Sequence, residues 1–199
     1  MLMVPLQLVG CVFVADFLSG LVHWLEDSYG REDQPVWGAV LLENNRHHQQ
    51  PGYFTGLSWW ESSKSLVLVA AAAGLVVWCL GLFSWQLAVV LVLGANANQI
   101  HKWAHRSRRR NGPAISLLQD WGVFQSAAHH AGHHAGRRWR RRFCVLTPHL
   151  NRWLDGIGFW HGLERGIELL TGVAPRDPNS GPLPAPARVR PRPGTRGRR

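Results

Sequence analysis

Histidine pairs within residues 129–134 have the spacing found on metal-binding helices. The segment reads His-His-Ala-Gly-His-His, so His129/His133 and His130/His134 form two i, i+4 pairs that are offset by one residue. Because residues four apart lie on the same helix face, one helix turn could present imidazoles to two metal ions. This doubled pair is the most specific chemical signal in the chain.

Two further histidine groups have spacings that suit metal binding. His101 and His105 form another i, i+4 pair, which directs two imidazoles to one side of a helix. His47 and His48 are adjacent and cannot share a helix face, but a loop or a helix end can aim them at neighbouring ions. Both groups are therefore candidate ligands.

A fourth group combines one histidine with acidic residues near the end of an apolar segment. Asp16, His23 and Asp27 are separated by seven and four residues, which places them on one helix face. Ionisable groups at the end of a membrane span are costly and usually functional. We predict that His23 is a ligand and that Asp16, Asp27 and Asn98 hydrogen-bond to ligand imidazoles and orient them.

The number of histidines predicts two metal ions rather than one. A mononuclear site takes three or four protein ligands, whereas nine of the eleven histidines belong to the four groups. Imidazole suits iron, zinc, copper and nickel, so the spacing leaves the metal open. His149 and His161 stand alone and are predicted not to be ligands. The predicted metal ligands are His23, His47, His48, His101, His105, His129, His130, His133 and His134.

Apolar segments of membrane-spanning length separate these groups. Residues 66–83 are an unbroken run of apolar residues and glycine, and about 20 residues cross a bilayer core. A second run covers 85–93, and the short link between the two predicts a helical hairpin. Residues 2–25 are a third candidate span. A buried helix pair in a soluble core is the alternative, but the length of the first run favours a span.

The basic residues set the orientation of the predicted spans. Arginines cluster at 106–110 and 137–142, and the positive-inside rule assigns such clusters to the cytoplasm. With three spans, the N-terminus then lies outside and all four histidine groups lie on the cytoplasmic side. We therefore expect a multi-pass protein of a bacterial-type inner membrane.

The C-terminal residues differ in composition from the rest of the chain. Residues 174–199 hold seven Arg, seven Pro and one Asp, so they carry most of the net charge of +10. This composition predicts a disordered tail after a single domain at 1–173. The tail could touch nucleic acid by charge alone, but we expect no specific nucleic-acid partner. Three widely separated cysteines exclude a disulfide-stapled secreted domain.

The elements together predict the fold class. Residues 150–170 mix Leu, Ile, Trp and Phe with charged side chains, which is typical of amphipathic helices at a membrane interface. The predicted fold is an all-α integral membrane helical bundle with a cytoplasmic His-rich di-metal site and a disordered Pro/Arg C-terminal tail.

Several motifs follow one another between about residues 14 and 165. They are Asp-Phe-Leu-Ser-Gly-Leu-Val-His-Trp at 16–24, Arg-His-His-x-x-Pro at 46–51, Gln-Ile-His-Lys-Trp-Ala-His at 99–105, Leu-Gln-Asp-Trp at 118–121, His-His-x-x-His-His at 129–134, Phe-Cys at 143–144 and Gly-Phe-Trp-x-x-Leu-Glu at 158–164. In this order they resemble the Kua-type lipid desaturases, a family that includes plasmanylethanolamine desaturases and a plastid phosphatidylglycerol acyl desaturase.

The resemblance implies a membrane-bound, O2-dependent di-iron lipid desaturase that places a double bond in an alkyl or acyl chain. It also implies that the nine grouped histidines hold two iron ions, and that a cytochrome b-type or ferredoxin-like protein donates electrons. The residues alone leave two alternatives open: a di-metal lipid hydroxylase, and a non-enzymatic His-rich membrane protein that binds or transports metal. The chain departs from the family at 55–58 and 137–142, where further histidines are usual.

Overall fold

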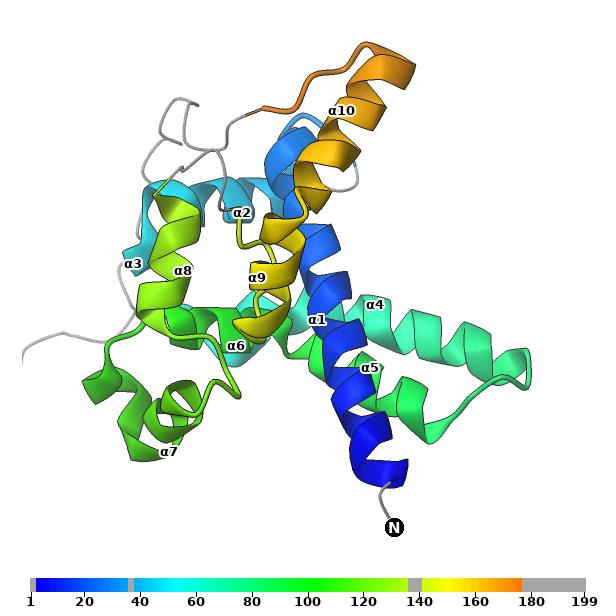
Figure 1. The fold of residues 1–199 in the computed structure, drawn as a ribbon, viewed down its shortest axis with the longest axis vertical. Coiled ribbons are helices and arrows are strands. Elements are labelled where there is room, and N and C mark those ends of the chain that lie inside the picture. Colours follow the sequence, from blue (N-terminus) through cyan, green and yellow to red (C-terminus); the bar gives the residue numbers. More distant parts are fainter. Residues whose placement is uncertain (1–2, 36–37, 136–140, 177–199) are drawn as a thin grey trace, which may run out of the picture.

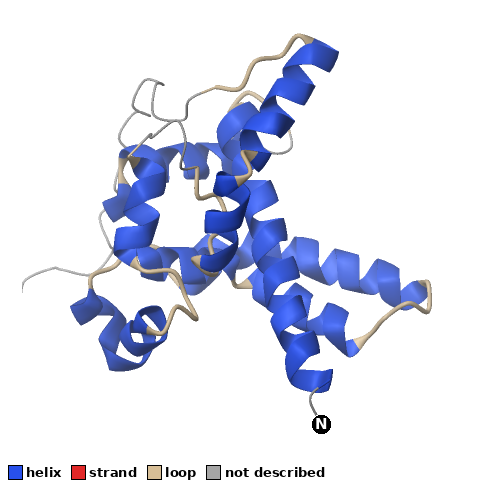
Figure 2. Cartoon of the chain, in the orientation of Figure 1, coloured by secondary structure: helices blue, strands red, loops and turns tan. Residues whose placement is uncertain are grey.

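A computed structural model describes residues 3–35, 38–135 and 141–176. These residues form ten helices and no strands (Figures 1 and 2), which confirms the predicted all-α class. The helices are α1 (Met3–Tyr29), α2 (Gly38–Gln49), α3 (Pro51–Gly56), α4 (Trp59–Cys79), α5 (Trp85–Ala95), α6 (Ala97–Ala104), α7 (Arg108–Asp120), α8 (Ala127–His134), α9 (His149–Gly156) and α10 (Phe159–Thr171).

Helices α4 and α5 form the predicted hairpin. Helix α4 begins seven residues before the apolar run, where a capping box stabilises its N-terminus. Ser58 Oγ accepts a hydrogen bond from the Glu61 amide at 3.2 Å, and the Glu61 carboxylate accepts one from the Ser58 amide at 2.7 Å. Gly81, with φ 69°, turns the chain back toward α5. In Figure 1 the hairpin extends from one side of α1, and α2, α6 and α8 lie on the other side.

Among the described residues, two helices are long and apolar enough to cross a membrane, namely α1 and α4. The predicted span at 85–93 corresponds to α5, which has only 11 residues. At 1.5 Å per residue such a helix covers roughly 16 Å of a hydrocarbon core of about 30 Å. Helix α5 ends at Ala95 and α6 begins at Ala97. Between them, Asn96 accepts a hydrogen bond from Trp59 Nε1 at 3.0 Å. The three-span topology stays a prediction.

A buried segment, residues 143–147, ties the C-terminal half to α1. Asp16 accepts hydrogen bonds from the Leu146 amide at 2.9 Å and from the Thr147 hydroxyl at 2.6 Å. The segment passes so close to α1 that a Cβ on Gly20 would lie 2.6 Å from the Cys144 sulfur. Glycine at position 20 therefore allows the contact, and Cys144 is completely buried there.

Residues 150–170 form the two predicted helices, α9 and α10, which are separated by a left-handed residue at Gly158. Both are amphipathic: Asn151, Trp160 and Glu164 are buried, whereas Trp153 and Leu170 are exposed. Their placement at a membrane interface stays a prediction. The predicted tail is described only as far as Arg176, which is hydrogen-bonded to α1. Arg176 is therefore ordered, and the rest of the predicted tail, residues 177–199, lies outside the described residues.

Candidate metal centre

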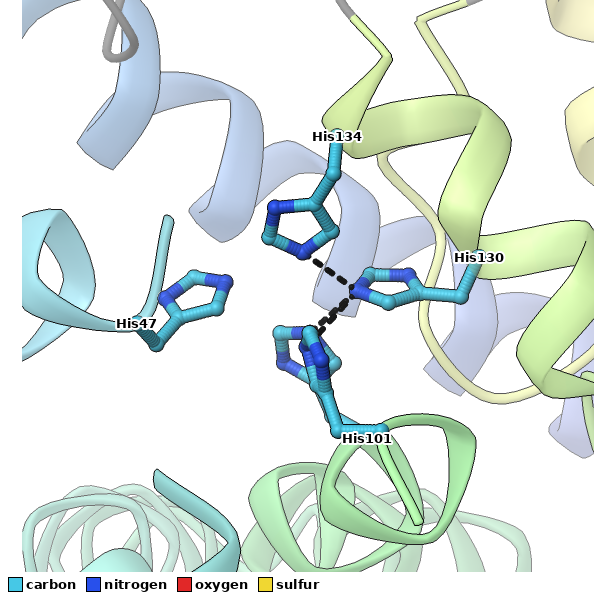
Figure 3. Close-up of side chains that lie close together, drawn as sticks. His47, His101, His130 and His134 are labelled. Carbon is cyan, nitrogen blue, oxygen red and sulfur yellow. Dashed lines mark hydrogen bonds between the residues drawn. The ribbon is translucent and has the colours of Figure 1, made fainter. Parts of the chain in front are cut away.

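Five histidines converge between α2, α6 and α8, and we call them the five-histidine cluster. One ring nitrogen from each lies within 4.8 Å of all the others. Figure 3 shows the four labelled rings turned toward one another from three separate helices. His105 completes the set from the C-terminal end of α6. The members are His47, His101, His105, His130 and His134.

A second group adjoins the first and contains a carboxylate, so we call it the carboxylate cluster. Its members are His23 and Asp27 from α1, His48 from α2 and His133 from α8. The Nε2 atoms of the three histidines lie 3.5, 3.0 and 3.3 Å from the Asp27 oxygens, in that order. All four residues are buried. This geometry places Asp27 among the imidazoles as a candidate ligand, rather than behind them as predicted.

The five-histidine cluster has nitrogen lone pairs that its own hydrogen bonds cannot satisfy. The Nε2 atoms of His101, His105 and His130 are mutually separated by 2.8 to 3.1 Å, and His134 Nε2 lies 3.0 Å from that of His130. An imidazole nitrogen either carries a proton or offers a lone pair. Three such atoms in a triangle cannot all be paired, whereas a bound cation would accept all the lone pairs together. The donor set therefore fits a metal ion.

The tautomers in the carboxylate cluster can be assigned from backbone contacts. The Nδ1 atom of His23 lies 3.1 Å from the Phe143 carbonyl, and His133 Nδ1 contacts the Arg141 carbonyl. A carbonyl oxygen can only accept, so both rings are protonated on Nδ1 and direct an Nε2 lone pair at Asp27. These Nε2 atoms and Asp27 Oδ2 are buried without a hydrogen-bond partner. A cation between them would satisfy all three.

The charge state of the five-histidine cluster also favours metal binding. Burial, together with repulsion from neighbouring imidazoles, lowers the pKa of His105 to about 4. Burial, again joined by repulsion from neighbouring rings, lowers the pKa values of His47, His101, His130 and His134. These rings are neutral at pH 7, which is the form that binds metal.

The two clusters are close enough to hold a pair of neighbouring ions. His47 and His48 belong to different clusters, yet their ring centroids are only 4.4 Å apart. On α8, His133 belongs to one cluster and His134 to the other, with centroids 5.3 Å apart. Helices α2 and α8 therefore each serve both clusters. One cluster offers imidazoles alone and the other offers a carboxylate as well.

His129 is the one predicted ligand that the structure leaves out of both clusters. Its Nε2 atom lies 3.2 Å from the side-chain amide of Asn151 on α9. Residues advance by about 100° along a helix, so His130, His133 and His134 share an arc of about 100° and His129 lies beyond its edge. His149 and His161, which were predicted not to be ligands, also lie outside both clusters.

Two predicted orienting residues hydrogen-bond to other groups in the structure. Asp16 holds the 143–147 segment, and Asn98 donates to the Ser62 carbonyl at 2.6 Å. Neither hydrogen-bonds to an imidazole within the described ranges. A residue that the sequence reading missed orients the carboxylate instead: Asn44 donates to Asp27 Oδ1 at 2.7 Å. Asn44 lies four residues before His48 and so on the same helix face, which is the feature of the sequence that could have indicated its role.

An open apolar cavity of about 610 Å³ reaches both clusters. Its walls come from α1, α4 and α5 and include Leu18, Val69 and Val90. Its lining also includes His23 of the carboxylate cluster and His101 of the five-histidine cluster. A chain of methylene groups lying against these walls would lose contact with water and would reach the candidate metal ligands.

Comparison with known proteins agrees with the site. A family model described as the lipid desaturase domain matches residues 12–178. The chain is 36% identical to plasmanylethanolamine desaturase 1 of Mus musculus over 188 residues, covering 86% of this chain and 69% of the relative. It is 30% identical to a probable fatty acid desaturase of Acanthamoeba polyphaga mimivirus, with 86% of each chain covered.

A plant relative extends the comparison to plastid proteins. The chain is 31% identical to fatty acid desaturase 4-like 1, chloroplastic, of Arabidopsis thaliana, covering 86% of this chain and 59% of the relative. No solved structure matches the chain. The motifs quoted from the sequence indicated this family, and the comparisons confirm it. The chain is a member of the lipid desaturase family and an oxidoreductase of that class.

Proposed function

We propose that this protein is a membrane-bound, O2-dependent di-iron desaturase that introduces a double bond into an alkyl or acyl chain of a membrane lipid. The observation that carries the proposal is the apolar cavity whose lining includes histidines of two adjoining clusters, both of which contain buried ligand atoms without a hydrogen-bond partner. The printed names of the relatives, which include a plasmanylethanolamine desaturase and fatty acid desaturases, support a lipid chain as substrate.

The reaction needs a strong oxidant at the end of the cavity. Two hydrogen atoms leave neighbouring carbons and a C=C bond forms. O2 takes up these two hydrogens, two electrons from a cytochrome b-type or ferredoxin-like donor and two protons, which gives two waters. Iron bound by the clusters would supply O2 activation, which side chains alone cannot provide. Iron is the metal we propose, since the ligand types alone fit other metals too.

The residues of the chain position the reactants. The walls contributed by Leu18, Val69 and Val90 would hold the lipid chain and exclude water from its reacting carbons. The carbonyls of Phe143 and Arg141 fix the tautomers of two imidazoles. Asn44 fixes the carboxylate of Asp27. These contacts hold the ligand atoms in place before metal binds.

The membrane setting is part of the proposal. Helices α1 and α4 are long enough to cross a bilayer, and α4 exposes Leu68, Leu75 and Trp78. An exposed apolar surface of this kind is stable in lipid and unfavourable in water. The positive-inside rule then puts the histidine clusters on the cytoplasmic side. A lipid chain could enter the cavity from the bilayer, between the spanning helices.

Lipid mass spectrometry of cells that produce the intact protein tests the proposal. We expect a new lipid species lighter by two hydrogens, and acid treatment reveals whether the double bond is a vinyl ether. His133→Ala should abolish the product, because it removes a ligand at the centre of the carboxylate cluster. His161→Ala is the matched control, since His161 lies outside both clusters. A hydroxylated lipid, or full activity in His133→Ala, would contradict the proposal.

A further inference from the structure

Arg176 fastens the last described residues of the chain to the end of α1. Its backbone amide donates to the Ser28 carbonyl at 2.9 Å. Its guanidinium donates to the carbonyls of Asp27 at 3.0 Å and Glu26 at 3.2 Å. Carbonyls in the last turn of a helix lack the full set of helical N–H partners, so these contacts satisfy the C-terminus of α1 directly behind the Asp27 carboxylate.

The same guanidinium reaches across to α2. Its Nη2 atom donates to Asn45 Oδ1 at 2.6 Å, and Asn45 Nδ2 in turn donates to Glu32 at 2.6 Å. Asn45 is buried, so both ends of its amide are engaged away from solvent. A planar guanidinium with several donors can hold two elements at once, which a lysine ammonium cannot do with the same geometry.

This contact joins the two helices on which the carboxylate cluster depends. Helix α1 supplies Asp27, and α2 supplies His48, whose Nε2 atom lies 3.0 Å from Asp27 Oδ1. Asn44, next to the Arg176-bound Asn45, holds the same Asp27 oxygen. A small slide of α2 along α1 would separate the imidazole from the carboxylate, and metal sites tolerate displacements of only about 0.5 Å.

We infer that Arg176 is a positioning residue of the metal centre, which sets the register of α2 against α1 and so completes the carboxylate cluster. The inference rests on the metal-binding part of the proposed function. It assigns a role in the site to a residue at the start of the Pro/Arg tail, which composition alone marks as dispensable. It predicts that a truncated chain that keeps Arg176 binds metal normally, and that a truncated chain that lacks Arg176 does not.

Binding of cobalt(II) to the purified, metal-depleted full-length protein tests this role without depending on lipid turnover. We expect the unaltered chain to bind two cobalt ions, with the absorption spectrum of bound cobalt as the readout of ligand geometry. We call the ion at the carboxylate cluster the second ion. In Arg176→Ala, its affinity should fall about 10-fold or more, which is the range found when groups that orient ligands are removed. Arg165→Ala on α10 removes an exposed arginine and serves as the charge-matched control.

Two further comparisons separate positioning from general stabilisation. Asn45→Ala breaks the link to α2 but leaves the contacts between Arg176 and α1, so it should weaken the second ion as Arg176→Ala does. The double variant should be no worse than either single variant. A chain that ends at Ser180 should bind both ions normally, whereas one that ends at Pro175 should lose the second.

The outcomes distinguish this inference from the proposed function. If Arg176→Ala or Asn45→Ala binds the second cobalt ion as tightly as the unaltered chain, with the same spectrum, the positioning role is overturned. If only Arg176→Ala is weakened, Arg176 merely caps α1 and the inference is again wrong. If the unaltered chain binds two ions but makes no double bond, the proposed function fails while the positioning role stands on the cobalt data.

Discussion

At the scale of single residues, Asp27 is the group around which the site is organised. Its carboxylate faces three imidazole Nε2 atoms within 3.5 Å and accepts from Asn44. The i, i+4 spacing of His23 and Asp27 placed both on one helix face, which the sequence could predict. The ligand-like position of Asp27 could not be predicted, because it depends on how α2 and α8 meet α1.

Replacing the carboxylate should weaken metal binding at the carboxylate cluster. In Asp27→Asn the side chain keeps its size but loses its negative charge, so we expect binding of one metal ion to weaken about 10-fold or more while the other ion stays bound. Metal analysis of the purified protein measures this. Asp120→Asn, which alters an exposed ion pair with Arg108, should retain two ions, and a two-ion Asp27→Asn protein would refute the assignment.

The low pKa of His105 predicts how acid affects the metal-depleted protein. Folding lowers this pKa from 6.5 to about 4, so below pH 6.5 the unfolded chain binds a proton that the folded chain does not. His105 therefore contributes stability above pH 6.5, and this contribution is lost as the pH falls toward 4.

Thermal unfolding of chelator-treated protein at a series of pH values measures the effect. We expect the unfolding temperature to fall between pH 6.5 and 4, and His105→Gln to have a shallower dependence. An equally steep dependence in the variant would show that His105 does not titrate in this way.

At the scale of the elements, a few close contacts decide whether ligands from distant segments meet. The 143–147 segment packs against Gly20 and supplies the carbonyl that holds His23. Sequence periodicity predicted α1 and the hairpin of α4 and α5, since each has a long apolar run. It did not predict the contact between Asn96, which follows α5, and Trp59 on α4, because these residues are far apart in the sequence.

A methyl group added at Gly20 should disturb both packing and metal binding. The new Cβ would lie 2.6 Å from the Cys144 sulfur and 3.0 Å from its backbone nitrogen, so the segment must shift. We expect Gly20→Ala to lower the free energy of unfolding by about 1–3 kcal/mol, which is typical of overpacking. Gly10→Ala on the same helix meets no atom within 4 Å. In thermal unfolding, Gly10→Ala should therefore be nearly as stable as the unaltered protein. An equal loss of stability in Gly10→Ala and Gly20→Ala would contradict the contact.

At the scale of the whole molecule, a largely apolar cavity reaches the two candidate metal-binding clusters. Helices α1, α4 and α5 contribute to its walls, and its lining includes His23, His47 and His101. The sequence predicted which histidines to consider and the apolar character of the walls. It could not predict that His129 turns to Asn151, because neighbouring positions on one helix can face different partners.

Filling the cavity should stop lipid chemistry without removing metal. Ala70 lines the cavity, so Ala70→Phe should exclude the lipid chain and abolish the desaturated product while the protein still binds two ions. Ala71 is exposed and does not line the cavity, so Ala71→Phe should retain both product and metal. Lipid mass spectrometry and metal analysis decide the case, and a normal product from Ala70→Phe would show that the substrate binds elsewhere.

The central claim is that the two clusters hold a pair of neighbouring iron ions. X-ray absorption at the iron edge of the purified, iron-loaded protein tests it most directly, because it reports the ligand elements and any nearby metal. We predict two irons per chain, nitrogen and oxygen ligands with strong imidazole scattering, and a second iron as a neighbour. Iron that is bound singly without an iron neighbour, or by sulfur, would contradict the account.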